Sequence, residues 1–327
     1  MKPVSPCLNS ASNREMEYPH KPVMVDEVVD QLVTRPYGIY VDATAGTGGH
    51  SEAVLKRLDA RGRLICVDRD SDALEITKKR LTGSGVAKVS FKNRNFSEMD
   101  EVFRESGIEK ADGILFDLGM STFQLDHSGR GFSFMRDEPL DMRMDITKGK
   151  NAGELVNNLS AGQLERILKK YGEEKKAGAI SRAIVKEREK SPIESTGRLA
   201  NLIRSKFPSS PKNRKKDPAT RTFQALRIMV NREMQNLEGI LEKTPGLIKE
   251  GGRVLFLTYH SLEDRLVKTA MVDWERSCDC PPDFPVCVCN RKALFRRLNR
   301  SGLVPGKEEI ASNPRARSAR LRSSERI

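Results

Sequence analysis

The stretch that decides the fold is IYVDATAGTGGHSEAVLKRLDARGRLICVD, residues 39–68. It holds two apolar runs that end in Asp42 and Asp68, and a glycine-rich turn, GTGGH, follows the first run at residues 46–50. Apolar runs separated by such a turn and a short amphipathic segment predict a strand, a helix and a second strand. Glycine lets the backbone turn sharply and lie against a ligand, and an acid about 20 residues later is placed to bind ribose hydroxyls. The stretch therefore predicts a site for a nucleotide-like ligand.

Two residues distinguish this turn from a dinucleotide site. The dinucleotide pattern G-x-G-x-x-G has a third glycine for close helix packing, and Ser51 occupies that position here. Asp42, before the turn, would repel a pyrophosphate but suits a cationic ligand. S-adenosylmethionine carries a sulfonium, an amino group and a ribose but no phosphate, so we predict it as the cofactor. The alternative is a turn that only caps a helix in an ordinary parallel sheet.

Further apolar runs at 89–91, 114–116 and 254–257 alternate with helical patterns. This alternation predicts an α/β fold in which a parallel sheet is covered by helices on both faces. Ligands of such sheets bind beyond the carboxyl ends of the strands. Asp117 follows the run at 114–116, so we expect Asp42, Asp68 and Asp117 to converge on one cleft. Aspartate also caps helices, which would explain one such acid more easily than three.

The domain organisation follows from the distance between Asp117 and the run at 254–257, which exceeds what one crossover needs. Helical patterns fill most of this stretch and predict a helical domain inserted into the sheet domain. We expect one long helix to lead back to the sheet, with a face formed by Phe223, Leu226, Val230, Met234, Leu237 and Leu241. The predicted division is a disordered leader at 1–19, a first core part at 20–124, the insertion at 125–219, and a second core part at 220–327 with a Cys-rich loop and a basic tail.

The charge is concentrated in blocks. The 327-residue chain has 58 Lys and Arg against 45 Asp and Glu, a net charge of +13. Residues 291–327 contain eleven Lys and Arg against three Glu, and the run from Arg204 to Lys216 contains no acid. Such blocks favour a nucleic-acid partner bound with strong salt dependence, although a solvated surface is the simpler explanation.

The sequence contains no apolar run of about 18 residues, and residues 1–19 lack the apolar core of a secretory signal. We therefore expect a cytoplasmic protein with no membrane partner. The oligomeric state, a homodimer included, stays open.

Two motifs supply candidate catalytic residues. Asp117 begins DLGM, and His260 lies in YHSLEDR after the last apolar run. Methylation of an exocyclic amine needs an acceptor for the amine protons, because the nitrogen lone pair is delocalised into the ring. Asp117 could be that acceptor, although amino-methylating enzymes often carry Asp/Asn-Pro-Pro-aromatic there and only the first residue matches. His260 is the second candidate, and a helix start capped by Ser261 explains its segment equally well.

Four cysteines fall within twelve residues, at Cys278, Cys280, Cys287 and Cys289. Zinc sites usually use C-x₂₋₄-C pairs, and these C-x-C pairs are tighter. Prolines 281, 282 and 285 stiffen the loop that would gather the thiols. The cysteines are either a metal site or reduced thiols in a proline-rich loop.

Six motifs, in the expected order, make the chain from about His20 to its end resemble the bacterial 16S rRNA cytosine-N4 methyltransferases, also called ribosomal small subunit methyltransferase H. They are VDATAGTGGHS (41–51), DGILFDLGMS (112–121), RGFSFMRDEPLDMRMD (130–145), DPATRTFQALRI (217–228), YHSLEDR (259–265) and NPRARSARLR (313–322). The resemblance implies a Rossmann-like, S-adenosylmethionine-dependent methyltransferase with an inserted helical domain. It also implies a cytoplasmic enzyme that acts on a decoding-centre cytosine of the small ribosomal subunit.

The resemblance further implies a set of cofactor contacts: Gly48, Gly49, His50, Asp68, Phe96, Asp117 and Gln124. Tyr259 is a departure, because phenylalanine is usual at that position. Some family members have the cysteine loop and others lack it, so the resemblance leaves the metal open. Two rival hypotheses are an rRNA-binding assembly factor with a structural cofactor site, and an enzyme of the same fold that acts on DNA or protein.

Overall fold

The computed structural model describes residues 22–208, 217–281 and 286–327. Its centre is a seven-stranded sheet in the order β3-β2-β1-β4-β5-β7-β6, in which β7 is antiparallel to both β5 and β6 and the other neighbouring strands are parallel. The predicted α/β fold is confirmed. The strands are β1 (Ile39–Asp42), β2 (Arg63–Asp68), β3 (Lys88–Asn93), β4 (Ala111–Asp117), β5 (Ile248–Thr258), β6 (Phe295–Arg297) and β7 (Arg320–Arg326).

Helices cover both faces of the sheet because neighbouring strand residues point to opposite sides. In β4, Ile114 and Phe116 belong to one apolar layer and Leu115 to the other. Each fully buried side chain of this kind stabilises the fold by about 1.5–3 kcal/mol. One layer includes α4 (Met99–Ser106), α11 (Glu233–Leu247) and α12 (Ser261–Glu275); the other includes α1 (Val25–Leu32), α2 (Gly49–Leu55) and α3 (Ser71–Leu81).

The chain reverses its direction of winding between β1 and β4, which lie side by side at the middle of the sheet. Open parallel sheets bind ligands in the crevice at such a switch point. The glycine-rich turn, the short helix η1 (Phe96–Glu98) and α5 (Thr122–Asp126) all follow strands at this edge. The topology therefore gathers the predicted site residues at one end of the sheet.

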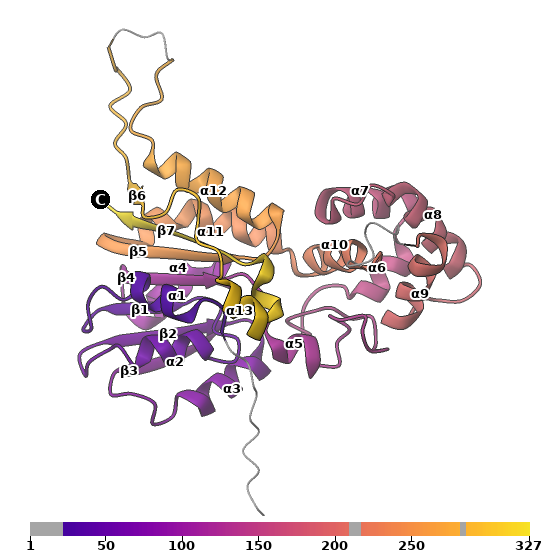
Figure 1. Cartoon of the computed structure of the whole chain (residues 1–327), viewed down its shortest axis with the longest axis horizontal. Helices are drawn as coiled ribbons and strands as arrows, with labels where there is room; N and C mark the ends of the chain where they lie inside the picture. Colours follow the sequence, from indigo (N-terminus) through magenta and orange to yellow (C-terminus); the bar gives the residue numbers. More distant parts are fainter. Residues whose placement is uncertain (1–21, 209–216, 282–285) are drawn as a thin grey trace, which may run out of the picture.

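A helical lobe lies beside the sheet (Figure 1). It contains α6 (Ala152–Asn158), α7 (Ala161–Gly172), α8 (Ala177–Arg188), α9 (Thr196–Lys206) and α10 (Thr220–Asn231). The prediction of one long returning helix was wrong. Arg232 has a left-handed φ of 52°, which ends α10 and separates it from α11. As a result α10 packs on α7 in the lobe, whereas α11 packs against the sheet.

The C-terminal residues are not a loose tail. The segment contains α13 (Lys307–Ser312) and η3 (Pro314–Ser318), and it ends in β7, which pairs with β5 and β6 inside the sheet. Arg322, 4% exposed, binds both oxygens of Asp264 at 2.7 and 3.0 Å. Several arginines of this basic block are therefore structural, and the prediction of a phosphate-binding tail was wrong for them.

The leader at 1–19 and most of the basic run from Arg204 to Lys216 lie outside the described residues. Arg204 is described, and its Nε donates to Asp217 at 2.8 Å. Of the helices in the described parts of the chain, none combines the length and apolar composition needed to cross a membrane.

Candidate active site

A cavity of about 300 Å³ lies at the carboxyl ends of β1, β2 and β4. We call it the first cavity. Its volume is at the lower end of the range of about 300–1,000 Å³ that is typical of small-molecule sites. Its walls include most of the residues predicted to contact the cofactor, namely Gly49, His50, Asp68, Phe96, Asp117 and Gln124.

Gly48 is the predicted contact that does not line the first cavity. It is the N-cap of α2 with φ at 83°, and a Cβ there would lie 3.0 Å from Thr77 Cγ2. Glycine is therefore required at this position by the left-handed backbone and the close approach of α3. Its role in the structure is to shape the turn.

Asp68 ends β2 and holds the glycine-rich turn in place. Its Oδ2 accepts a hydrogen bond from Gly46 N at 2.8 Å, and its Oδ1 accepts one from Asp70 N at 2.8 Å. Each carboxylate oxygen has a further lone pair, so Asp68 can still accept hydrogen bonds from a ligand hydroxyl. Burial raises the pKa of this carboxyl to about 6.

Asp42 does not converge on the first cavity with Asp68 and Asp117, so that prediction was wrong. It is 2% exposed, and its Oδ2 accepts a hydrogen bond from Ser51 Oγ at 2.6 Å. Burial raises its pKa. Ser51, the residue in place of the third glycine, thus has a partner in the acid before the turn. Asp42 and Ser51, the two residues that argued against a dinucleotide site, are therefore hydrogen-bonded to each other.

Asp117 is positioned from three sides. Its backbone N–H donates to Thr44 Oγ1 at 2.7 Å, and its Oδ1 accepts from Gly119 N at 3.2 Å. Its Oδ2 lies 3.5 Å from Nδ1 of His50, while Nε2 of that ring lies 2.9 Å from Val23 O. These contacts hold the carboxylate at the wall of the first cavity.

Tyr259 follows β5 and lies directly against the DLGM segment. A Cβ on Gly119 would come within 2.5 Å of the Tyr259 ring, so glycine there makes room for the aromatic side chain. Burial and the neighbouring carboxylate of Asp117 raise the pKa of Tyr259 well above its usual value. The end of β4 thus supplies an acid, and the residue after β5 supplies an aromatic ring next to it. The sequence analysis noted Tyr259 only as a departure from the family pattern and did not predict it as a site residue, although its position after an apolar run was the available clue.

Gln124 and Phe96 form two other walls. Gln124 is engaged within the protein, because its Oε1 accepts from Ser121 N at 3.3 Å and its Nε2 donates to Asp70 Oδ2 at 3.1 Å. Phe96 begins η1 and meets Phe116 edge to face, with ring centroids 6.0 Å apart. Phe96 therefore offers an apolar surface fixed by the core.

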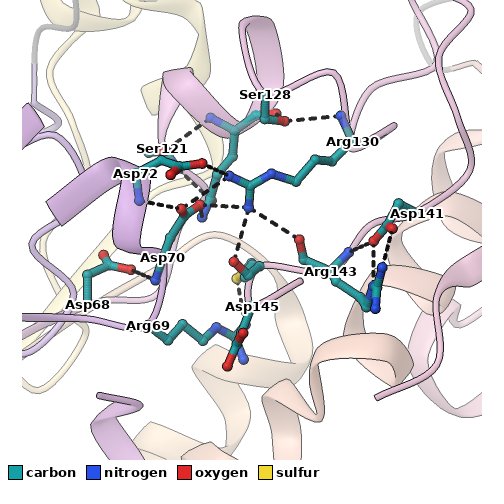
Figure 2. Close-up of polar contacts among 12 residues, drawn as sticks. Asp68, Arg69, Asp70, Asp72, Ser121, Ser128, Arg130, Asp141, Arg143 and Asp145 are labelled. Carbon is teal, nitrogen blue, oxygen red and sulfur yellow. Dashed lines mark hydrogen bonds and ion pairs between the residues drawn. The ribbon is translucent and has the colours of Figure 1, made fainter. Parts of the chain in front are cut away.

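A network of charges fixes the turn after β2 (Figure 2). Arg130, with 11% of its side chain exposed, donates to both oxygens of Asp70 at 3.1 and 3.2 Å and to Asp72 at 3.0 Å. Its Nη1 also donates to the carbonyl of Met144 at 3.0 Å. Such paired guanidinium–carboxylate bonds fix geometry as well as add energy. Arg130 is a positioning residue that we did not predict, although it begins the distinctive RGFSFMRDEPLDMRMD motif.

His260 does not line the first cavity. It is the N-cap of α12, the role that the sequence assigned to Ser261, and its Nδ1 accepts from Glu263 N at 3.4 Å. Its Nε2 lies 3.0 Å from Glu263 Oε1. Glu233 also approaches this group, but its carboxylate binds Arg227 at 2.8 and 2.9 Å. These side chains form a network of internal contacts.

A second cavity, of about 1,100 Å³, opens on the other side of Tyr259. It lies between the helical lobe, the start of α12 and the segment before β7, and we call it the second cavity. Its walls include the cationic side chains Lys176, Arg221, Arg317 and Arg320, together with His260 and Phe207. Tyr259 lines both cavities, so the two spaces lie next to each other at this residue.

Comparisons with known proteins show the family of this chain. The profile of the MraW methylase family matches residues 17–327. The chain is 43% identical over 312 residues to the "Ribosomal RNA small subunit methyltransferase H" of Clostridium botulinum, which covers 95% of this chain and all of that protein. It is 46% identical over 310 residues to the protein of the same name from Caldicellulosiruptor saccharolyticus, with 95% and 100% coverage. A solved rRNA methylase structure from Streptococcus thermophilus aligns with 12% identity and a TM-score of 0.36 over 93% of each chain.

Proposed function

The chain belongs to the MraW methylase family, and from this premise we propose that it methylates the exocyclic N4 amine of a decoding-centre cytosine in 16S rRNA. It is an S-adenosylmethionine-dependent methyltransferase. One observation carries the finer proposal: Asp117 and Tyr259 lie together at a cofactor-sized cavity, and Tyr259 also lines a larger cavity. The walls of that larger cavity carry four cationic side chains and four acidic ones, the latter from Glu173, Glu174, Asp217 and Asp264.

The first cavity fits S-adenosylmethionine by size and by the chemistry of its walls. Asp68 retains acceptor capacity for ribose hydroxyls, and Phe96 offers an apolar surface for the adenine. The glycine-rich turn before His50 brings backbone close to the ligand, and Gln124 completes the predicted set. When bound, the cofactor supplies an electrophilic methyl group on a positively charged sulfur.

Asp117 would orient the amine. The lone pair of a cytosine N4 is delocalised into the ring, and a carboxylate that accepts an N4–H hydrogen bond favours a pyramidal nitrogen aimed at the methyl group. Good alignment can lower the barrier by several kcal/mol, up to about 7–11. No strong base is needed, because the proton leaves easily once the nitrogen is alkylated. The Tyr259 ring would pack on the cytosine face and exclude water from the junction.

The second cavity would hold the nucleotides around the target. Lys176, Arg221 and Arg317 are suited to phosphates, and Phe207 could stack on a base. The cytosine must be unpaired or turned out of its stack to reach Asp117. The partner we propose is therefore the small ribosomal subunit, met in the cytoplasm.

The test uses the full chain, methyl-labelled S-adenosylmethionine and small subunits from a strain that lacks this gene. We expect the label in N4-methylated cytidine after the RNA is digested to nucleosides. Label in another nucleoside would refute the N4 assignment and leave the methyltransferase activity standing.

The rival assembly-factor hypothesis is tested with Asp117→Ala in the same strain. We expect the variant to bind subunits and to leave the cytosine unmethylated. Assembly is compared between the strain that carries the variant and the strain that lacks the protein. If both assemble subunits normally, the protein acts through methylation alone. If only the strain without the protein fails, binding of the protein itself contributes to assembly.

A further inference from the structure

The arm between α12 and β6 projects away from the sheet (Figure 1). Its base is attached to the core: Leu294 N donates to Trp274 O at 2.8 Å, and Arg297 binds Glu275. Farther out, four sulfurs converge, those of Cys278, Cys280, Cys287 and Cys289, with one ligand atom from each within 4.8 Å of all the others. They come from two C-x-C pairs on the two sides of the arm.

The distances between the sulfurs match a tetrahedral metal site. Sγ of Cys287 lies 3.4 Å from that of Cys278, 4.0 Å from that of Cys280 and 3.6 Å from that of Cys289. The sulfurs of Cys278 and Cys289 are 3.8 Å apart. Four thiolates around zinc at about 2.3 Å would be separated by about 3.8 Å, the edge of the tetrahedron. A disulfide would instead need about 2.05 Å.

A backbone amide from each C-x-C pair donates a hydrogen bond to a sulfur of the other pair. Asp279, the middle residue of the first pair, donates its N–H to Cys289 Sγ at 3.2 Å. Val288, the middle residue of the second pair, donates its N–H to Cys280 Sγ at 3.4 Å. Such donors stabilise sulfur that carries negative charge, as thiolate ligands do. Arg291, paired with Asp279 at 2.6 and 2.7 Å, adds a nearby positive charge.

Hydrophobic burial does not explain why the sulfurs converge. Cys287 is exposed, and Val286 and Val288 beside it are 69% and 65% exposed. Small exposed structures that lack a core are commonly held by disulfides or metals. We propose that the four cysteines bind one zinc ion, which fixes the arm.

The site would be structural. Four protein ligands leave no open position for a substrate or water, unlike a catalytic zinc site. The arm starts at the end of α12 opposite to His260, and fifteen residues of helix place it roughly 22 Å from the junction of the two cavities. Binding converts four thiols to thiolates and releases their protons to solvent, and the resulting net charge of −2 is offset by the amide donors and Arg291.

The test is metal analysis of the full chain, purified under reducing conditions without chelator and without a metal-binding tag. We expect one zinc ion per chain. The double variant Cys287→Ser/Cys289→Ser should lose more than nine-tenths of it. Cys66→Ala is the matched control, because Cys66 is buried in β2 and contacts Ser51; it should retain the full amount.

A second measurement covers the case in which the double variant does not fold. The wild-type chain, stripped with a chelator and kept reduced, should take zinc from a chromophoric chelator. Stripping should also speed tryptic cleavage at Arg291 and Lys292, and added zinc should reverse the effect. Failure of stripped chain to take up zinc, or full zinc in the double variant, would overturn the proposal. Stoichiometric iron in its place would refute zinc as the metal.

Discussion

The two cavities that meet at Tyr259 are built in different ways. The first is made largely by residues that follow β1, β2 and β4, and its walls are completed by residues of α11 and of the segment before β7. The second is made by helices of the lobe, the start of α12 and the segment before β7, which come together only in the folded chain. The first was largely predictable from the sequence, and the second was not.

This difference separates residues that the local sequence brings to the site from residues that only folding brings there. Local patterns place a cofactor beside Asp117, but the ring that closes the junction and the cations beyond it come from distant parts of the chain. The predictions below test whether the first cavity sets the chemistry and the second sets substrate binding.

Replacing Asp117 with Ala should lower kcat/KM for subunit methylation by about 10²–10³-fold, the usual cost of losing one oriented group that acts in the transition state. Asp117→Asn keeps one acceptor oxygen and should lose less. The measurement is single-turnover methylation, with subunit binding followed separately. If only the affinity for subunits fell, Asp117 would act in substrate binding and not in the methyl-transfer step.

Tyr259→Ala should lower kcat by tens of fold, because the ring that separates the cavities is removed and water enters the junction. Tyr259→Phe keeps the ring and removes only the hydroxyl, so we expect a change of less than about fivefold, roughly 1 kcal/mol. Gly119→Ala should resemble Tyr259→Ala, since its Cβ would meet the ring at 2.5 Å. Equal losses in the Ala and Phe variants would show that the hydroxyl, not the ring, matters.

Asp68→Asn should weaken cofactor binding by about tenfold, roughly one charge-assisted hydrogen bond. The pKa of Asp68, raised to about 6 by burial, also gives a pH dependence. As the pH falls through about 6, the carboxyl takes up a proton and loses acceptor capacity, so cofactor affinity should fall. The same raised pKa means that protonation favours the folded state, so Asp68 contributes more to stability at lower pH.

Titration calorimetry of the cofactor from pH 5 to pH 8 separates these effects. The Asn variant should show little pH dependence, and the exposed Asp59→Asn control should behave as wild type. A wild-type affinity that does not change across pH 6 would contradict the role of Asp68.

Arg221→Ala should raise KM for subunits a few-fold, leave cofactor affinity unchanged, and reduce the slope of log affinity against log salt by about one, as expected for one phosphate contact. Arg61→Ala is the control, because Arg61 is exposed and pairs with Asp59 outside both cavities. A changed kcat with an unchanged salt slope would exclude the second cavity as a phosphate site.

The C-terminal basic block shows why composition misled. Its eleven Lys and Arg suggested a surface for nucleic acid, but Arg322 is buried against Asp264, and Arg296 pairs with Glu325 on the next strand. The net charge of a segment does not show which of its cations form ion pairs with acids elsewhere in the folded chain. The acids that pair with these arginines include some outside the block, such as Asp264.

Periodicity and turn chemistry act over a few residues, so the sequence alone predicted β1 to β5, the glycine-rich turn and the positions of Asp68 and Asp117, but not β6 and β7. It could not determine that Asp42 is paired with Ser51, that Arg232 ends a helix, or that Tyr259 lies on Gly119. Those outcomes depend on which side chains meet across the fold and are decided by packing between distant segments. The same holds for the four cysteines of the arm: the sequence left a metal site and reduced thiols both open, and the convergence of the sulfurs is seen only in the tertiary structure.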